Sequence, residues 1–280
     1  MQTRHKDRRK YFNELARTAE RHFMPYTDRW NSKGRAARVL EVGCGEGGNL
    51  LPWARRGCPV TGIDISKERI EEAQKFFSEA GATGQFVCAD ALKPVTHGKS
   101  YDLIIVHDVV EHIDEKTRLL LNLRQILADG GIIFAAFPSW LMPFGGHQQI
   151  AGSKLLSHLP FVHLLPYLAY RRIMEAFGEN PSTISELLDI KHTRCSISTF
   201  EHCIEKAGLE VADRRLYLIN PHYETKFGLR PKLLWRAAAS IPGLRDSLST
   251  SCWYILRKKH INKHLSNNIT RKHMPQHSAE

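Results

Sequence analysis

Acidic residues stand at the ends of three β-branched runs, where each could hold part of a nucleoside-containing ligand. Glu41 lies in the first run and precedes a glycine cluster, Gly43-Cys-Gly-Glu-Gly-Gly48. Asp64 ends the second run and Asp90 follows the third. A carboxylate at such a position can accept hydrogen bonds from ribose hydroxyls or from a purine amino group. Because glycine has no Cβ atom, the cluster lets the backbone approach a ligand closely. The pattern indicates a site for a nucleoside cofactor.

A second group of residues has the chemistry needed to move a proton. Asp108, Glu111 and His112 lie close together in the sequence, and His147 follows two glycines. Neutral imidazole is a suitable base near pH 7. We therefore expect Glu111, His112 and His147 to be catalytic, with His147 on the acceptor side; the alternative is that the histidines only cap or pack. The same side chains have the ligand types for a divalent ion, but we interpret the site as metal-free.

A parallel α/β sheet would bring these residues together, and the hydrophobic pattern predicts one. Ligands bind beyond the carboxyl ends of the strands in such a sheet. Ser66 is placed to cap a helix that reaches about Glu79, and Ser198 begins a capping box that opens a helix to Ala207. Another helix is expected at residues 115–128. Strands are expected at residues 38–42, 59–63, 85–88, 101–107, 131–137, 209–219 and 252–256.

Five motifs, in order within roughly residues 36–138, resemble those of class I S-adenosylmethionine-dependent methyltransferases. Within that superfamily they are similar to the branch of ubiquinone-type O- and C-methyltransferases. The resemblance implies a Rossmann-like, seven-stranded, mostly parallel sheet with helical lid insertions after strands five and six. It also implies an enzyme that uses S-adenosylmethionine and releases S-adenosylhomocysteine (SAH). The motifs are Glu41–Gly47, Gly62–Ser66, Cys88–Ala91, His107–Ile113 and Asp129–Gly131.

The resemblance also implies which residues contact the cofactor. They are Glu41 near the amino group, Gly43, Cys44 and Gly45 along the methionine part, Asp64 at the ribose, Ile65 on the adenine, Asp90 and Ala91 at the adenine edge, and His107 and Asp108 under the sulfonium. An NAD dehydrogenase also has a glycine loop followed by an acidic strand end. It leaves the Asp90-Ala91 pair and the segment 108–112 without a role, so it is the weaker interpretation.

Two alternatives to a metal-free small-molecule enzyme remain open. Small-RNA terminal 2′-O-methyltransferases carry a related set of a carboxylate, a Glu-His pair and a distal His, and some ubiquinone-type relatives are described as metal-dependent. The resemblance therefore allows an RNA methyltransferase, with or without a divalent ion, although Asp108 replaces the first Glu of that set. The other alternative is a protein that binds the cofactor without catalysis and acts as a partner of other proteins.

The acceptor side is expected in two insertions, residues 139–195 and 220–250. We expect them to form a lid over the cofactor, with Asn220, His222, Tyr223 and His147 lining the substrate pocket. Their aromatic and apolar content favours a small molecule, a lipid precursor or a saccharide as the acceptor of an O-methylation. The remaining divisions are an N-terminal helical segment (1–35), the methyltransferase core (36–138, 196–219 and 251–258) and a basic tail (259–280).

The net charge of +11 on 280 residues does not by itself indicate a nucleic-acid partner. Residues 1–10 carry five Lys or Arg against one Asp, and residues 257–280 carry six against one Glu, so the ends supply +9. The nearly neutral body disfavours RNA as the acceptor. Six cysteines without a C-x-x-C pair favour a reduced, cytoplasmic protein. No secretory leader or uninterrupted apolar span is evident, whereas peripheral membrane contact is compatible with the sequence. The oligomeric state is not indicated.

Overall fold

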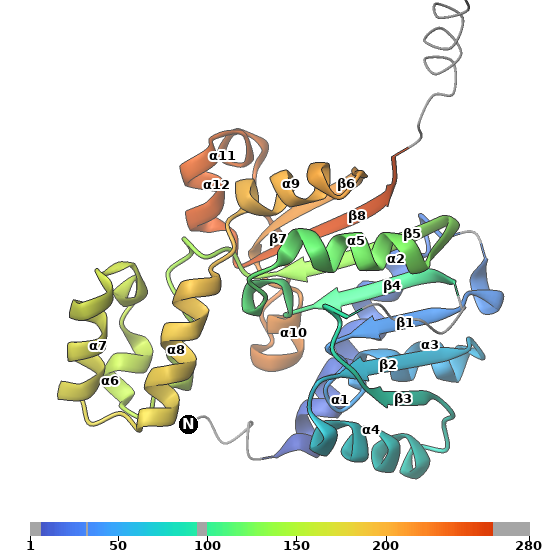
Figure 1. Ribbon diagram of the computed structural model, residues 1–280, viewed down its shortest axis with the longest axis horizontal. Coiled ribbons are helices and arrows are strands. Elements are labelled where there is room, and N and C mark those ends of the chain that lie inside the picture. The colour runs from blue at the N-terminus through green and yellow to red at the C-terminus, as the bar shows by residue number, and fades with distance from the viewer. Residues whose placement is uncertain (1–6, 32, 94–99, 260–280) are drawn as a thin grey trace, which may run out of the picture.

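The computed structural model describes residues 7–31, 33–93 and 100–259, which form an eight-stranded sheet covered by helices (Figure 1). The strand order is β3-β2-β1-β4-β5-β8-β6-β7. The pairs from β3 to β5 are parallel, and β8 runs antiparallel to both β5 and β6. The predicted α/β, Rossmann-like, mostly parallel class is confirmed. The strands are β1 (Val39–Val42), β2 (Val60–Asp64), β3 (Gln85–Cys88), β4 (Tyr101–His107), β5 (Leu127–Phe137), β6 (Leu209–Ile219), β7 (Lys232–Leu233) and β8 (Ser251–Lys258).

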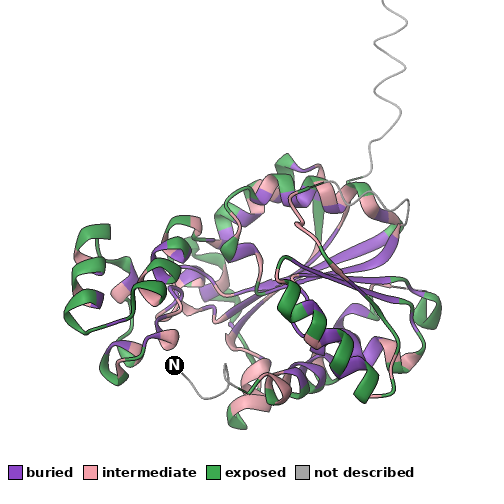
Figure 2. Ribbon diagram, turned by 60° about the horizontal axis from the view of Figure 1, so that its bottom comes forward, coloured by how far each residue is buried: buried purple, intermediate pink, exposed green. Residues whose placement is uncertain are grey.

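Helices bury both faces of the sheet, which explains why β1, β2 and β4 are buried along their whole length. Such strands read as continuous apolar runs because neither face meets water. One face packs against α1 (Arg8–Thr18), α2 (Met24–Thr27), α3 (Leu51–Arg56) and α4 (Lys67–Glu79). The other packs against α5 (Lys116–Ile126), α9 (Ile197–Lys206) and α11 (Arg236–Ser240). The sheet accordingly appears buried in Figure 2.

Short helical turns connect the main elements. A five-residue π-helix, Ala19–Phe23, joins α1 to α2, so the described part of the predicted N-terminal segment is mostly helical. Turns of 3-10 helix lie at Gly34–Ala36, Gly48–Leu50, Val110–His112, Gln148–Ile150 and Val162–Leu164. Two of these turns, at Gly48–Leu50 and Val110–His112, follow β1 and β4 at the sheet edge where the site was expected.

The two predicted insertions lie in different places. Residues 139–195 contain α6 (Lys154–His158), α7 (Tyr167–Ala176) and α8 (Pro181–Thr193), which form a lobe beside the sheet (Figure 1). This lobe has its own small core around Leu156, Tyr170 and Met174. Residues 220–250 divide instead: α10 (His222–Phe227) packs on α1, whereas α12 (Pro242–Leu248) lies against the sheet beside α9 and β6.

Three details of the sequence prediction are wrong. The sheet has eight strands rather than seven, because the two-residue β7 is too short to leave a hydrophobic pattern. β5 begins at Leu127 rather than residue 131, since a register shift opposite Tyr101 takes the Asp-Gly-Gly turn into the strand. Helix α9 is capped by Ser196 rather than Ser198; the Ser196 hydroxyl accepts a hydrogen bond from the Thr199 amide. In contrast, Ser66 caps α4 as predicted.

Within the described residues, no helix combines the length and apolar character that crossing a bilayer requires. Of the predicted basic tail, only residue 259 belongs to the described part of the chain, and residues 260–280 lie outside it. Residues 1–6, which carry part of the N-terminal charge, also lie outside it.

Candidate active site

The glycine loop leaves β1 in a conformation that requires glycine at its first position. Gly43 has a φ of 67°, and a Cβ atom there would lie 2.3 Å from Val109 Cγ2. Any side chain at this position would therefore collide with the loop that follows β4. Helix α1 covers the far end of the same loop, because the Gly48 Cα lies close against the Phe12 carbonyl and Leu15. The loop is thus held between α1 and the β4 loop.

Asp64, the predicted ribose ligand, is held rigidly at the end of β2. Its Oδ2 accepts a hydrogen bond from the Gly45 amide and its Oδ1 accepts one from the Ser66 amide, both at 2.9 Å. The side chain ties the glycine loop to the start of α4 and keeps further lone pairs for a ligand. Ile65 beside it is 76% exposed, an unusual state for isoleucine that suits a residue expected to pack on an adenine ring.

Glu41, the residue expected near the cofactor amino group, is fully buried at the end of β1. Its Oε1 accepts a 2.7 Å hydrogen bond from Asn49 Nδ2. Burial raises the pKa of Glu41 to about 8. Among the described residues, Glu41 Oε2 and Asn49 Oδ1 have no hydrogen-bond partner. Two buried acceptors without a donor fit an ammonium group such as that of the methionine part of the cofactor.

Asp90 and Ala91 lie where the resemblance places the adenine edge. Asp90 Oδ1 accepts a 2.9 Å hydrogen bond from the Leu92 amide, and the Ala91 carbonyl accepts one from Asn122 Nδ2 of α5. Both residues are half-buried, so the turn is held by these hydrogen bonds and stays partly exposed. This third strand end completes the series that begins with Glu41 and Asp64, since β1, β2 and β3 are neighbours in the sheet.

The two residues that leave β4 differ in orientation. His107 is buried, with Nδ1 3.4 Å from Asn49 Nδ2 and its ring centroid 5.0 Å from that of Phe23. Asp108 is more exposed and has a φ of 53°, a left-handed conformation that is uncommon outside glycine. Non-glycine residues in this region cluster at functional sites. The two side chains face each other, with His107 Nε2 3.5 Å from Asp108 Oδ2.

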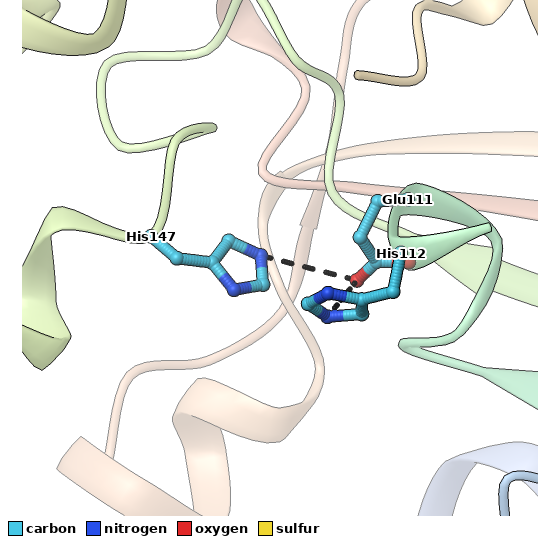
Figure 3. A group of neighbouring side chains, drawn as sticks. All are labelled: Glu111, His112 and His147. Atoms are coloured by element: carbon cyan, nitrogen blue, oxygen red, sulfur yellow. Dashed lines mark ion pairs between the residues drawn. The ribbon is translucent and has the colours of Figure 1, made fainter. Parts of the chain in front are cut away.

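The side chains of Glu111, His112 and His147 lie close together (Figure 3). Glu111 and His112 belong to the turn after β4, whereas His147 belongs to the segment after β5. The Nε2 atoms of His112 and His147 each lie 3.9 Å from Glu111 Oε1, and the two imidazole rings cross at 81°. Neither oxygen of the buried Glu111 has a hydrogen-bond partner among the described residues. Burial, reinforced by the nearby Asp108 carboxylate, raises the pKa of Glu111 well above its usual value, and burial lowers the pKa of His112.

The lobe holds this cluster through the C-terminal end of α8. The Thr193 hydroxyl donates a 2.6 Å hydrogen bond to the backbone carbonyl of Glu111. The ammonium of the buried Lys116 donates to the carbonyls of Ile113 and Thr193. The turn that carries Glu111 is therefore held by the nearby Lys116 and by Thr193, which lies far along the chain. Sequence reasoning missed Lys116 and Thr193, since neither has a motif.

A cavity of about 200 Å³ opens beside the cluster and contains the predicted substrate residues. Its lining includes His147, Asn220, His222 and Tyr223, together with Asp108. His112 does not face this cavity; it lines a separate groove along α8. The remaining lining residues, most of which sequence reasoning did not assign to the pocket, come from α1, the segment after β5, α10 and the residue before β8: Tyr11, Pro138, Met142, Phe144, Gln149, Ile150, Lys226 and Thr250.

Side-chain contacts join helices α1 and α10 beside this cavity. The Thr18 hydroxyl lies 2.9 Å from His222 Nδ1 and 3.1 Å from the Thr225 hydroxyl. In the π-helix that follows α1, His22 Nε2 lies 2.7 Å from a Glu224 carboxylate oxygen. His222 is therefore engaged by α1 as well as lining the cavity. The N-terminal helix thus contributes to the wall of this cavity through Tyr11, a role that its sequence alone does not indicate.

Comparison with known proteins shows what this site is similar to. The predicted resemblance is confirmed: residues 40–135 match the family model described as a methyltransferase domain. Relatives of the chain include ubiquinone biosynthesis O-methyltransferases of Rhizobium leguminosarum bv. trifolii, 29% identical, and Agrobacterium fabrum, 33% identical, each over 123 residues. Each alignment covers 44% of this chain and 49% of the relative. The chain thus spans about half the length of these curated relatives.

Solved structures show the same fold over more of the chain. A plantazolicin methyltransferase in complex with a pentazolic analog and SAH is 17% identical, with a TM-score of 0.57 and coverage of 92% of this chain and 89% of that one. An S-adenosylmethionine-dependent methyltransferase from Clostridium acetobutylicum ATCC 824 is 10% identical, with a TM-score of 0.55 and coverage of 89% and 92%. At these identities the likeness concerns the fold alone.

Proposed function

We propose that this protein transfers a methyl group from S-adenosylmethionine to a hydroxyl of a small or amphipathic acceptor. The observation that carries the proposal is the placement of two unlike groups at one edge of the sheet. Carboxylates suited to the cofactor lie at the carboxyl ends of β1, β2 and β3. The Glu111–His112–His147 cluster, built from the segments after β4 and β5, lies beside a cavity. A methyl donor and a proton acceptor at adjacent positions are what O-methylation requires.

The chain's own residues would position the cofactor. When bound, S-adenosylmethionine supplies an activated methyl group on a sulfonium, so the protein's task is mainly orientation. Glu41 and Asn49 offer buried oxygen acceptors for the amino group, and Asp64 offers carboxylate lone pairs for the ribose. Because Asp64 is already held by two backbone amides, these acceptors are fixed before a ligand arrives.

His147 is the residue best placed to take the acceptor proton. It lies in the cavity wall, with its imidazole against the buried Glu111. Glu111 Oε1 lies 3.9 Å from His147 Nε2, and neither oxygen of Glu111 has a hydrogen-bond partner among the described residues. When ionised, this carboxyl group would stabilise a proton on His147. His112, on the other side of Glu111, would hold the carboxylate in place.

A divalent ion is the second way in which this cluster could activate a hydroxyl. One ligand atom from each of Glu111, His112 and His147 lies within 4.8 Å of the other two. A buried carboxylate that lacks hydrogen-bond donors, next to two imidazoles, fits such an ion. The ion would act as a Lewis acid that lowers the pKa of the acceptor hydroxyl.

Calorimetry and methyl-transfer assays test the proposal in steps. S-adenosylmethionine should bind to the wild type and bind about 10- to 100-fold more weakly to Asp64→Ala. Transfer to simple phenols, catechols and amphipathic alcohols should then fall in His147→Ala while cofactor affinity stays unchanged. Full activity in the presence of a chelator supports the base, whereas loss restored by one divalent ion supports the metal. Absence of cofactor binding to the wild type, or transfer to RNA alone, would contradict the proposal.

A further inference from the structure

Arg69, in the first turn of α4, is an exposed cation that the folded chain leaves without an anionic partner. Among the described residues, it forms no ion pair with a carboxylate, because Glu68 and Glu72 beside it on α4 both pair with Arg8 of α1. The first turn of a helix is also an unfavourable place for a cation, since the positive end of the helix dipole lies there. An anion from outside the chain would therefore stabilise Arg69.

The guanidinium of Arg69 lies over the glycine loop. A Cβ atom at Gly45 would be 3.7 Å from Arg69 Nη1, so the guanidinium is on the side of the loop to which a side chain would point. The pKa of His112, in the turn after β4, is lowered mainly by burial and also by the positive charge of Arg69. Arg69 thus carries its charge from α4 to the region where the glycine loop and the turn after β4 face each other.

The methionine part of the cofactor is expected in this region, because Gly45 belongs to the residues that the resemblance places along it. That part of S-adenosylmethionine carries an ammonium, a sulfonium and a carboxylate. The buried oxygens of Glu41 and Asn49 suit the ammonium. A guanidinium repels both cationic groups, so the carboxylate is the charged group of the cofactor that Arg69 can attract.

We propose that Arg69 binds the carboxylate of S-adenosylmethionine and thereby distinguishes the complete cofactor from nucleosides that lack this group. The planar guanidinium can donate two parallel hydrogen bonds to a carboxylate. Arg8, which also reaches the glycine loop, is not available for this role, because Glu46, Glu68 and Glu72 hold its guanidinium. The assignment rests on the cofactor part of the proposed function and is independent of the acceptor.

Calorimetry with two ligands that differ in one group tests the proposal without methyl transfer. Decarboxylated S-adenosylmethionine keeps the adenosine, the sulfonium and the amino group and lacks only the carboxylate. The wild type should bind S-adenosylmethionine about 10- to 100-fold more tightly than this analogue, because the analogue loses a charge-assisted pair. In Arg69→Met this preference should fall to about twofold or less, since the guanidinium is gone. Arg69→Lys should keep part of the preference, because lysine retains the charge without the paired donors.

Two control variants separate this contact from general charge and from the structure of the loop. Lys67→Met removes a cation from the same turn of α4, and Arg8→Met removes the arginine that pairs with Glu46 of the glycine loop. Both should keep the wild-type preference between the two ligands, even if Arg8→Met weakens the binding of both. Circular dichroism verifies that each variant is folded.

The ligand comparison also gives the results that would overturn the proposal. Equal weakening of both ligands by Arg69→Met would do so, as would a loss of preference in Lys67→Met that matches the loss in Arg69→Met. Weaker binding of 5′-methylthioadenosine to Arg69→Met would place the guanidinium on the adenosine and overturn it as well. Wild-type protein that binds the two ligands equally contradicts this assignment alone, whereas wild-type protein that binds neither contradicts the proposed function and this assignment with it.

Discussion

The proposed cofactor half and the proposed acceptor half of the site are held in different ways. In the cofactor half, Asp64 and Asp90 accept hydrogen bonds from nearby backbone amides, and both lie at the ends of strands in the main core. In the acceptor half, Glu111 has no hydrogen bond to its carboxylate among the described residues, and its backbone is clamped by Thr193 of the lobe. The fold alone fixes the first half, whereas the second depends on where the lobe sits.

The largest effect should come from Glu111, because its buried carboxyl group is the acid on which the proposed acceptor half depends. Glu111→Gln keeps the size of the side chain but removes the group that could ionise to support a proton or an ion at His147. We expect turnover to fall about 1,000-fold. S-adenosylmethionine affinity, measured by calorimetry, should change less than about twofold, because the cofactor half does not use this residue. A matching loss of cofactor affinity would show that the halves are not separate.

Acid should loosen the lobe before the sheet, because the lobe contains a buried neutral histidine. His163 Nε2 donates a 2.8 Å hydrogen bond to the Trp140 carbonyl, and burial lowers the pKa of His163 to about 4. The unfolded residue takes up its proton near pH 6.5, so lobe stability is complete above that pH and falls by about 3 kcal/mol as pH drops to 4. Hydrogen exchange at pH 4.5 and 7 measures this loss.

The variant His163→Gln provides the control for this prediction. Its side-chain amide can still donate to the Trp140 carbonyl but cannot take up a proton. The additional acid sensitivity of residues 139–195, relative to the sheet strands, should therefore disappear in the variant. Equal loss of protection in lobe and sheet of the wild type would mean that the two unfold as one unit.

A smaller effect is expected at Glu41, the buried carboxyl group of the proposed cofactor half. Its replacement can be compared with that of Glu111 in the proposed acceptor half. Glu41→Gln should weaken S-adenosylmethionine binding about 10- to 100-fold, because an ammonium loses its charged partner. Burial raises the pKa of Glu41 to about 8, so the folded protein without cofactor loses stability as pH rises from about 4.5 to 8. Urea unfolding should show that the variant loses less stability over this range. Unchanged cofactor affinity would refute the assignment.

The sequence predicted closely the strands and turns that carry the proposed cofactor residues, because local signals encode them. The acidic strand ends follow β-branched runs, a glycine cluster follows β1, and β3, β4 and β6 have the predicted bounds. The contacts of these residues with a cofactor stay predictions. The cluster of Glu111, His112 and His147 was also predicted, since loops that leave neighbouring parallel strands meet at one edge. Their catalytic roles stay predictions.

The remainder depends on contacts between distant segments, which no local pattern encodes. Lys116 and Thr193 act through backbone carbonyls, so their residue types carry no motif. The contact of α10 with α1 joins residues about 200 positions apart. The lobe, α10 and α12 were grouped as one predicted lid, although α10 and α12 pack on opposite faces of the sheet region. Asn49 was missed because its partner Glu41 lies on the other side of the glycine cluster.

The position of α1 bears on the order of events in a catalytic cycle. This helix packs on the glycine loop through Phe12 and Leu15, and its Tyr11 lines the acceptor cavity. A single element thus contacts the glycine loop and lines the cavity, so exchange of a nucleoside at the loop would disturb the helix that shapes the cavity. Steady-state kinetics should therefore be ordered: the methyl donor enters first, the methylated acceptor leaves next, and SAH leaves last.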